Sequence, residues 1–260
     1  MAATYLYAIT DRTASPLPDL PGLEEAPLYQ LACQDLMGVM SAVTATQVQP
    51  TESNLWQHEM IVEALMADRA VLPVRFGTVF STEAMAHAEL LAHQADLLAS
   101  LNRVRGRVEL GLRILINPTT GGGLSQDERT PPVAPLPEPE KPLGSSETLK
   151  VSPVSRGRAY LMTRLAEEQR ARAERQQAEA QVAEIHGPLA QLAVDSVQQV
   201  LVTPRLLLTA AYLVERDRVE DFRQAVAALS DAHPALSLLC TGPWPPYNFI
   251  DLHAPVEPGG

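Results

Sequence analysis

The chain has 260 residues, a hydrophobic fraction of 46% and a formal net charge of −11 at pH 7. This length can bury the core of one or two domains. The acidic balance argues against nucleic acid and an anionic membrane surface as partners, because both attract basic patches. The chain has no apolar run of the roughly 18 residues that a membrane span needs, and its first residues lack the pattern of a secretory signal. We therefore expect a cytoplasmic protein.

Residues 1–105 predict an N-terminal α+β domain. Runs of β-forming and apolar side chains predict strands, and apolar residues at helical spacing predict helices. Ser81 is the expected N-cap of the second helix, and Gly106 is expected to end it. The expected strands cover residues 4–10, 28–33, 36–44 and 70–76, the middle two as a hairpin, and the expected helices begin at residues 51 and 81.

Arg75 stands out because it lies inside an apolar run that reads Val-Leu-Pro-Val-Arg-Phe-Gly-Thr-Val-Phe from residue 71 to residue 80. A guanidinium group in a buried strand needs a partner to offset its lost hydration. We expect a structural ion pair with Glu59 or Glu63, which lie one helical turn apart just before this strand, and regard anion binding or catalysis by Arg75 as the weaker alternative. Arg75, Phe76 and Gly77 then form a structural motif, in which Gly77 adopts a backbone conformation that other residues disfavour.

Residues 106–260 predict a second domain. Its expected elements are a strand at 107–116, a long helix at 156–186 that ends at Gly187-Pro188, strands at 196–203 and 205–214, a helix at 219–229 and a strand at 236–241. This order is that of a modified ferredoxin-like βαββαβ domain. Residues 118–155 interrupt it with a Pro- and Gly-rich insertion that lacks large apolar residues, and we expect this insertion to be disordered.

The long helix has an unusual composition. Between Glu167 and Gln181 its only apolar residues are alanines, and charged pairs four residues apart support an exposed helix. A helix that is polar on all sides projects from a domain or bridges two of them. Tyr160, Leu161 and Leu165 precede this charged stretch, and we expect them to bind a partner together with neighbouring sheet.

A second motif, near the end of the chain, combines prolines with aromatic residues. It comprises Gly242, Pro243, Trp244, Pro245, Pro246 and Tyr247. We expect a stiff turn that packs as a plug, with an aromatic ligand groove as the weaker alternative. The histidines are not clustered, no nucleophile elbow is present, and Cys33 and Cys240 suit a reduced core. We therefore expect no catalytic, cofactor-binding or metal-binding residues and no enzyme activity.

Three segments in this order resemble the gas vesicle protein F/L family: Tyr5 to Ile9, Leu72 to Phe80, and Gly242 to Phe249. The resemblance implies two α+β domains, the second ferredoxin-like. It also implies a non-enzymatic accessory protein of gas vesicle assembly and organisation, which is either a minor component inside the vesicle or a cytosolic helper. Of these two locations we expect a cytosolic or wall-associated helper, because a protein of charge −11 that faces gas would lose the hydration of its charged groups. The implied partners are the small hydrophobic shell subunit and other accessory vesicle proteins, and the oligomeric state stays open. The alternative from the residues alone is a small-molecule-binding regulatory protein with a ferredoxin-like domain.

Overall fold

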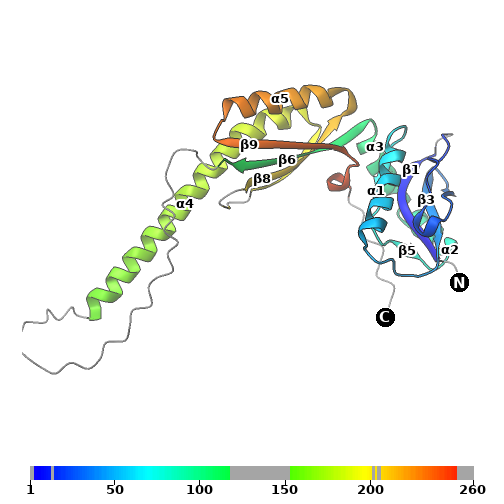
Figure 1. Ribbon diagram of the computed structural model, residues 1–260, viewed down its shortest axis with the longest axis horizontal. Helices are drawn as coiled ribbons and strands as arrows, with labels where there is room; N and C mark the ends of the chain where they lie inside the picture. Colours follow the sequence, from blue (N-terminus) through cyan, green and yellow to red (C-terminus); the bar gives the residue numbers. More distant parts are fainter. Residues whose placement is uncertain (1–2, 13–14, 118–152, 201–202, 204–205, 251–260) are drawn as a thin grey trace, which may run out of the picture.

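The structure, a computed structural model, describes residues 3–12, 15–117, 153–200, 203 and 206–250, with only the backbone described for 153–160, 171 and 174. The protein contains two antiparallel sheets with their own helices, and one helix extends far from the second sheet (Figure 1). The predicted α+β class is confirmed. The predicted insertion lies at residues 118–155, of which 118–152 fall outside the described residues.

The first sheet is built around strand β1 (Ala3–Asp11), which pairs with strands on both sides. The strand order is β2-β3-β1-β4, and β5 also pairs with β1. The hairpin partners are β2 (Tyr29–Cys33) and β3 (Leu36–Val43), as predicted, and the short strands are β4 (Val71–Pro73) and β5 (Val79–Phe80). The first eight residues of β1 are all buried, because helices cover both faces of the sheet.

One helix covers one face of the first sheet and two cover the other. Helix α1 (Glu52–Met66), capped by the Thr51 side chain, buries Ile61, Val62 and Leu65 on the face that carries Tyr5 and Tyr7. On the opposite face, α2 (Glu83–Ala92) and α3 (Gln94–Val104) bury apolar side chains beside Leu6 and Ile9 of β1. These apolar side chains are Ala86, Leu90, Leu97, Leu101 and Val104.

The structure corrects two expectations about the second helix of this region. The predicted single helix is two helices that meet at His93, and the N-cap is the Thr82 side chain, which accepts a hydrogen bond from the Met85 amide, rather than Ser81. No proline or glycine lies near His93, so the break carries no local sequence signal. Because α2 and α3 bury side chains in the same cluster, packing on the sheet accounts for the break.

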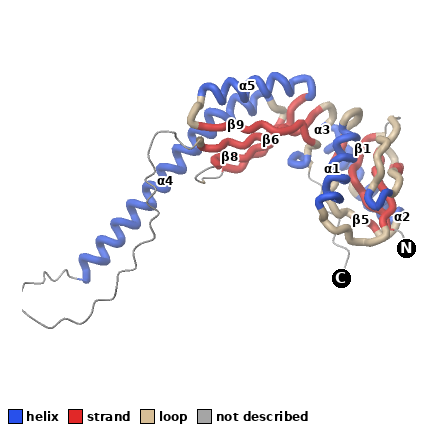
Figure 2. The backbone as a smooth tube through the Cα atoms, in the orientation of Figure 1, coloured by secondary structure: helices blue, strands red, loops and turns tan. Residues whose placement is uncertain are grey.

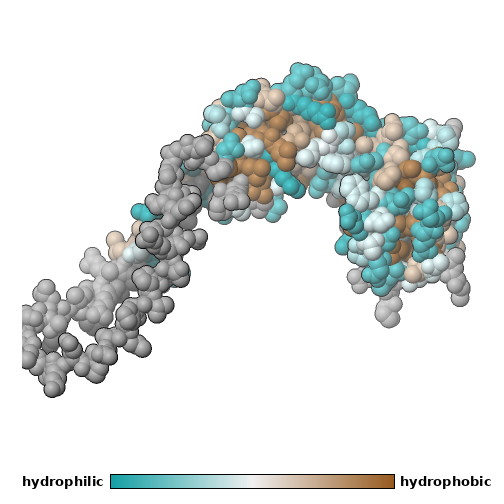
Figure 3. All heavy atoms as spheres, viewed as in Figure 1, coloured by the Kyte–Doolittle hydropathy of each residue, from teal (hydrophilic) through white to brown (hydrophobic). Residues whose placement is uncertain are grey.

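The second sheet has the strand order β7-β8-β6-β9, with all pairs antiparallel. Its strands are β6 (Arg107–Ile116), β7 (Asp195–Val200), β8 (Leu206–Glu215) and β9 (Leu236–Trp244). Figure 2 shows β8, β6 and β9 side by side. The chain order of strands and helices from residue 107 onward is the predicted one. Helix α5 (Val219–Ala232) buries Phe222 and Val226 against one face of this sheet and presents hydrophilic residues outward (Figure 3).

Helix α4 (Pro153–Leu192) packs on the same face of the second sheet, but only with its last turns. Ala178, Val182, Ile185 and Leu189 are buried there, whereas every described side chain from residue 161 to residue 177 is exposed. The predicted break at Gly187-Pro188 is wrong, because α4 runs on to Leu192. Ile185 and Leu189 pack on the sheet on both sides of Pro188, and this packing offsets the lost backbone hydrogen bond.

Candidate functional site

The turn that follows β4 contacts the centre of the first sheet. Gly77 has a φ of +87°, a left-handed conformation that residues other than glycine disfavour. Its amide donates to the Tyr5 hydroxyl at 3.0 Å, and the Phe76 ring lies edge-on against Tyr5 at 6.0 Å between centroids. Two of the three sequence segments singled out above therefore meet at Tyr5.

Tyr5 also joins a buried histidine. Its hydroxyl lies 2.9 Å from His58 Nδ1. Either group can donate in this hydrogen bond, and the tautomer of the neutral ring decides which one does. Burial lowers the pKa of His58 to about 4, an effect that the backbone of Val74 partly opposes. His58 is thus a neutral core residue, held between Tyr5, Tyr7 and Phe76.

The C-terminal motif packs between the two sheets as a plug. Pro245 and Pro246 are buried, and Phe249 lies against Ala211 and Leu213 of β8. The amide and side chain of Asn248 donate to the two carboxylate oxygens of Glu109, at 2.9 and 2.6 Å. Burial raises the pKa of Glu109, and these hydrogen bonds work against that rise. This segment therefore packs as a turn against its neighbours, which is the arrangement expected from its sequence.

The backbone of this plug also needs a glycine. Gly242 has a φ of +104°, and a Cβ added there would meet the Glu109 carbonyl oxygen at 2.7 Å. A larger residue would push β9 away from β6 at the point where Trp244 pairs with Glu109. Trp244 itself is 43% exposed and does not belong to the buried part of the motif.

The predicted ion pair of Arg75 is wrong. β4 ends at Pro73, and Arg75 is exposed in the turn. An exposed guanidinium keeps its hydration and requires no carboxylate. Glu59, one of its two expected partners, instead accepts a hydrogen bond of 2.9 Å from the Tyr247 hydroxyl, so the third segment reaches α1 next to His58.

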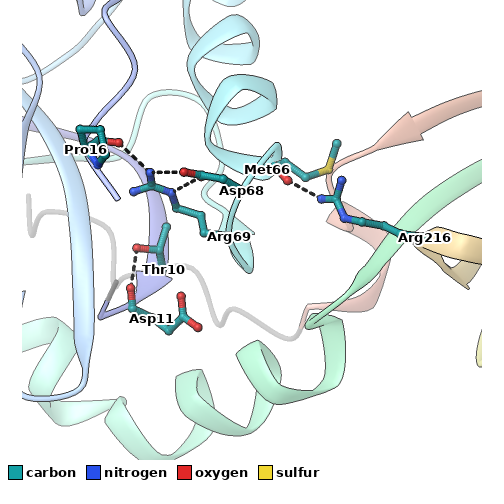
Figure 4. Close-up of polar contacts among 7 residues, drawn as sticks. All are labelled: Thr10, Asp11, Pro16, Met66, Asp68, Arg69 and Arg216. Carbon is teal, nitrogen blue, oxygen red and sulfur yellow. Dashed lines mark hydrogen bonds and ion pairs between the residues drawn. The ribbon is translucent and has the colours of Figure 1, made fainter. Parts of the chain in front are cut away.

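A polar seam also joins the two halves of the chain. The Arg216 guanidinium donates to the Met66 carbonyl at the end of α1, and Arg103 of α3 pairs with Asp195 of β7. A cleft of ≈ 360 Å³ lies along the seam, between Asp11, Arg69, Arg105 and Arg216. Figure 4 shows Arg69 donating to Asp68 and to the Pro16 carbonyl, and Arg216 donating to Met66.

The arginines of this cleft already have partners. Arg105 pairs with Asp11, Arg69 with Asp68, and Arg216 with a backbone carbonyl. The Asp68 pKa is lowered chiefly by the hydrogen bond from Arg69. Of these contacts, the one between Arg216 and Met66 connects the second half of the chain to the first, which is a structural role. In the parts of the chain that the structure describes, no three histidine, cysteine or acidic residues gather as a metal site.

Comparison with known proteins identifies the family. Residues 3–251 match the family model of the gas vesicle synthesis protein GvpL/GvpF. The chain belongs to the gas vesicle GvpL/GvpF family. Its relatives include gas vesicle protein F2 of Halobacterium salinarum, 25% identical over 97% of this chain and 94% of that protein. Gas vesicle protein L of a Streptomyces species is 28% identical over 98% of this chain and 97% of its own length.

Solved structures agree with this membership. The crystal structure of GvpF from Anabaena sp. PCC7120 has a TM-score of 0.70 and 20% identity and covers 96% of both chains. That of GvpF from Microcystis aeruginosa has a TM-score of 0.66 and 20% identity and covers 96% of this chain and 99% of its own. The fold is thus that of GvpF, and the family gives this chain a role connected with gas vesicles.

The predicted partner-binding residues lie at the far end of α4. Leu161 is 65% exposed and Leu165 is 48% exposed, and Met162 between them is also exposed. The side chain of Tyr160 lies outside the described residues. None of the described strands neighbours this end, because α4 meets the second sheet only from Ala178 onward (Figure 1). The expectation that neighbouring sheet contributes to this surface is therefore wrong, and we call Leu161, Met162 and Leu165 the α4 tip.

Sequence reasoning missed an exposed apolar pair on α1. Trp56 is 65% exposed and Met60 is 46% exposed, one helical turn apart. Within α1, the buried residues Ile61, Val62 and Leu65 account for the core face. Trp56 and Met60 lie on the face of α1 opposite to this core face. Their position was the sequence signal for an exposed apolar pair, since a core-facing helix needs apolar residues on one face only.

No helix among the described residues is long and apolar enough to cross a membrane.

Proposed function

We propose that this GvpL/GvpF family member is a non-enzymatic accessory protein that binds the small hydrophobic shell subunit during gas vesicle assembly. The observation that carries the proposal is the α4 tip, where three apolar side chains stand exposed at the end of a charged helix. Exposed apolar residues in contiguous positions are typical of interaction surfaces. Other accessory vesicle proteins are the second class of partner in this proposal.

The remainder of the exposed part of α4 supports the same role. The described Glu and Arg side chains of residues 166–177 are exposed, and Arg175 pairs with Glu179 at 3.0 Å. A charged helix adds solubility to a complex that contains an apolar partner. It also keeps that partner away from the sheets, since an α-helix of about 17 residues spans roughly 25 Å.

The charge of −11 bears on where the protein works. If the protein faced the gas inside a vesicle, its charged groups would lose their hydration, which costs a large amount of free energy. We place it in the cytoplasm or at the vesicle wall, in contact with the shell subunit before or during assembly. This proposal includes the expectation that it binds neither nucleic acid nor a membrane surface.

Co-purification of the shell subunit with the tagged protein tests the proposal. We expect capture by the unchanged protein and at least a tenfold loss with Leu161→Glu/Leu165→Glu, because the apolar contact area becomes charged. Met85→Glu is the matched control, since Met85 is 56% exposed on α2, far from α4. Binding through apolar contact should survive high salt. No capture by any form would end the proposal, and equal capture by all three would exclude the α4 tip.

A further inference from the structure

The exposed face of α1 carries more than its two apolar residues. Glu52, Trp56, Met60 and Glu63 follow one another at spacings of four, four and three residues, so they lie in one stripe along the helix. We call these four residues the α1 face. Glu59 borders the stripe and is tied to Tyr247, so the plug lies beside it. The stripe is roughly 16 Å long, about three turns of helix.

The two acidic residues of this face and the neighbouring Glu59 have no ion-pair partner in the described part of the chain. Among the residues that the structure describes, no basic side chain forms an ion pair with Glu52, Glu59 or Glu63. The Glu59 pKa is raised mainly by burial and further by the negative charge of Glu63, an effect that the Tyr247 hydroxyl opposes. A cation placed at this position would relieve the repulsion between Glu59 and Glu63.

We propose that the α1 face is a docking surface for a basic amphipathic helix of a partner protein. Apolar side chains of that helix cover Trp56 and Met60, and its lysines or arginines pair with Glu52, Glu59 and Glu63. The charge decides the class of occupant, because three carboxylates on one flank repel an acidic helix and leave a neutral one unpaired. The apolar pair supplies the contact area, and a tryptophan is a frequent centre of binding energy.

This inference does not depend on the α4 tip. The two surfaces lie on different helices at opposite ends of the molecule (Figure 1). A protein with both could hold the shell subunit by α4 while α1 engages another protein. Loss of one interaction therefore leaves the other measurable, and failure of the proposal for α4 leaves this one standing.

Trp56 provides a direct reporter. The chain has two tryptophans, so Trp244→Phe leaves Trp56 as the single source of indole fluorescence. The probe is a synthetic 18-residue helix of leucine and lysine with one apolar face. We expect its binding to shift Trp56 emission to the blue, because leucine side chains replace water around the indole. A peptide of the same shape with glutamate in place of lysine should give no shift.

Variants locate the contact. By anisotropy of the labelled lysine peptide, Met60→Ser and Glu52→Gln/Glu63→Gln should each raise Kd about tenfold or more. Glu167→Gln/Glu168→Gln on α4 is the matched control, because it alters the net charge equally and should leave Kd unchanged. Equal Kd for all variants would show general attraction to an acidic protein and overturn the proposal, as would the absence of binding. Sedimentation that shows a dimer dissociated by Met60→Ser would make a second copy the occupant, and would overturn it too.

Discussion

Strand β1 and the exposed part of α4 differ in how far their side chains are buried. β1 buries eight consecutive residues, and its hydroxyls at Tyr5 and Tyr7 are hydrogen-bonded to His58 and Ser41. The described side chains of α4 from residue 161 to 177 are all exposed, leucines included. The comparison teaches that apolar residues in this protein have two uses. In β1 they hold the fold, whereas at the α4 tip no contact within the described part of the chain accounts for them.

The largest expected effect separates these two uses directly. Ile61→Ala, on the buried face of α1, should lower the free energy of unfolding by about 2–5 kcal/mol, because it leaves a cavity against β1. Leu161→Ala at the α4 tip should change it by less than about 0.5 kcal/mol. Urea unfolding of both variants and of the unchanged protein measures these changes in the free energy of unfolding. A similar loss for Leu161→Ala would mean that the tip packs on something within the molecule.

The second prediction concerns acid. His58 has a folded pKa of about 4, below its unfolded value of roughly 6.5, so the unfolded state binds more protons between these values. Its contribution to stability is complete above pH 6.5 and should fall by on the order of 3 kcal/mol as the pH drops to 4. Glu59 and Glu109, with raised pKa values, act in the opposite direction.

A variant isolates the part due to the histidine. His58→Asn keeps a hydrogen-bonding group beside Tyr5 but cannot titrate, and this variant retains Glu59 and Glu109. The difference between the two proteins in unfolding free energy, followed from pH 7 to pH 4, reports His58 alone. Parallel curves would place His58 in contact with water instead of the core.

The third prediction concerns Gly77, whose amide donates to the hydroxyl of the buried Tyr5. Gly77→Val places a β-branched residue at a φ of +87°, which should cost about 1–2 kcal/mol even though a Cβ there meets no atom within 4 Å. The matched control is Gly187→Ala in α4, also in open space but helical, which should add roughly 0.5–1 kcal/mol. Opposite signs in thermal unfolding are the expected result. Stabilisation by both would mean that the turn relaxes freely.

The smallest expected effect is at Arg75. Since this residue is exposed, Arg75→Met should alter stability by less than about 0.5 kcal/mol. Chemical denaturation at low ionic strength gives the most sensitive measurement. A loss of several kcal/mol would instead restore the buried ion pair that the sequence suggested.

Local pattern predicted the regular parts of this fold well. The strand expected at 107–116 is β6 to the residue, because one face of the second sheet imposes alternation of apolar side chains. The break at His93 and the continuation of α4 through Pro188 were not predictable in this way. In both cases packing on a sheet overrides the local signal, and that sheet is assembled from distant segments.

The candidate sites show the same limit. Composition indicated the exposed helix and the residues of its tip, since both are local properties. The meeting of Gly77 with Tyr5, and of Tyr247 with Glu59, joins residues that are 72 and 188 positions apart. One sequence contains no spacing rule for such pairs, which explains why Glu59 was assigned to Arg75 and not to Tyr247.

The separation of Glu59 and Tyr247 in the sequence determines when their contact can form during synthesis. During synthesis, Glu59 is made 188 residues before the tyrosine that pairs with it. At roughly 5–20 residues per second, this interval lasts roughly 10–40 s. In that interval β1, α1 and their neighbours can fold, but Glu109 and Glu59 still lack the residues that cap them. The nascent protein can therefore complete its first sheet while the junction between the two sheets is still open.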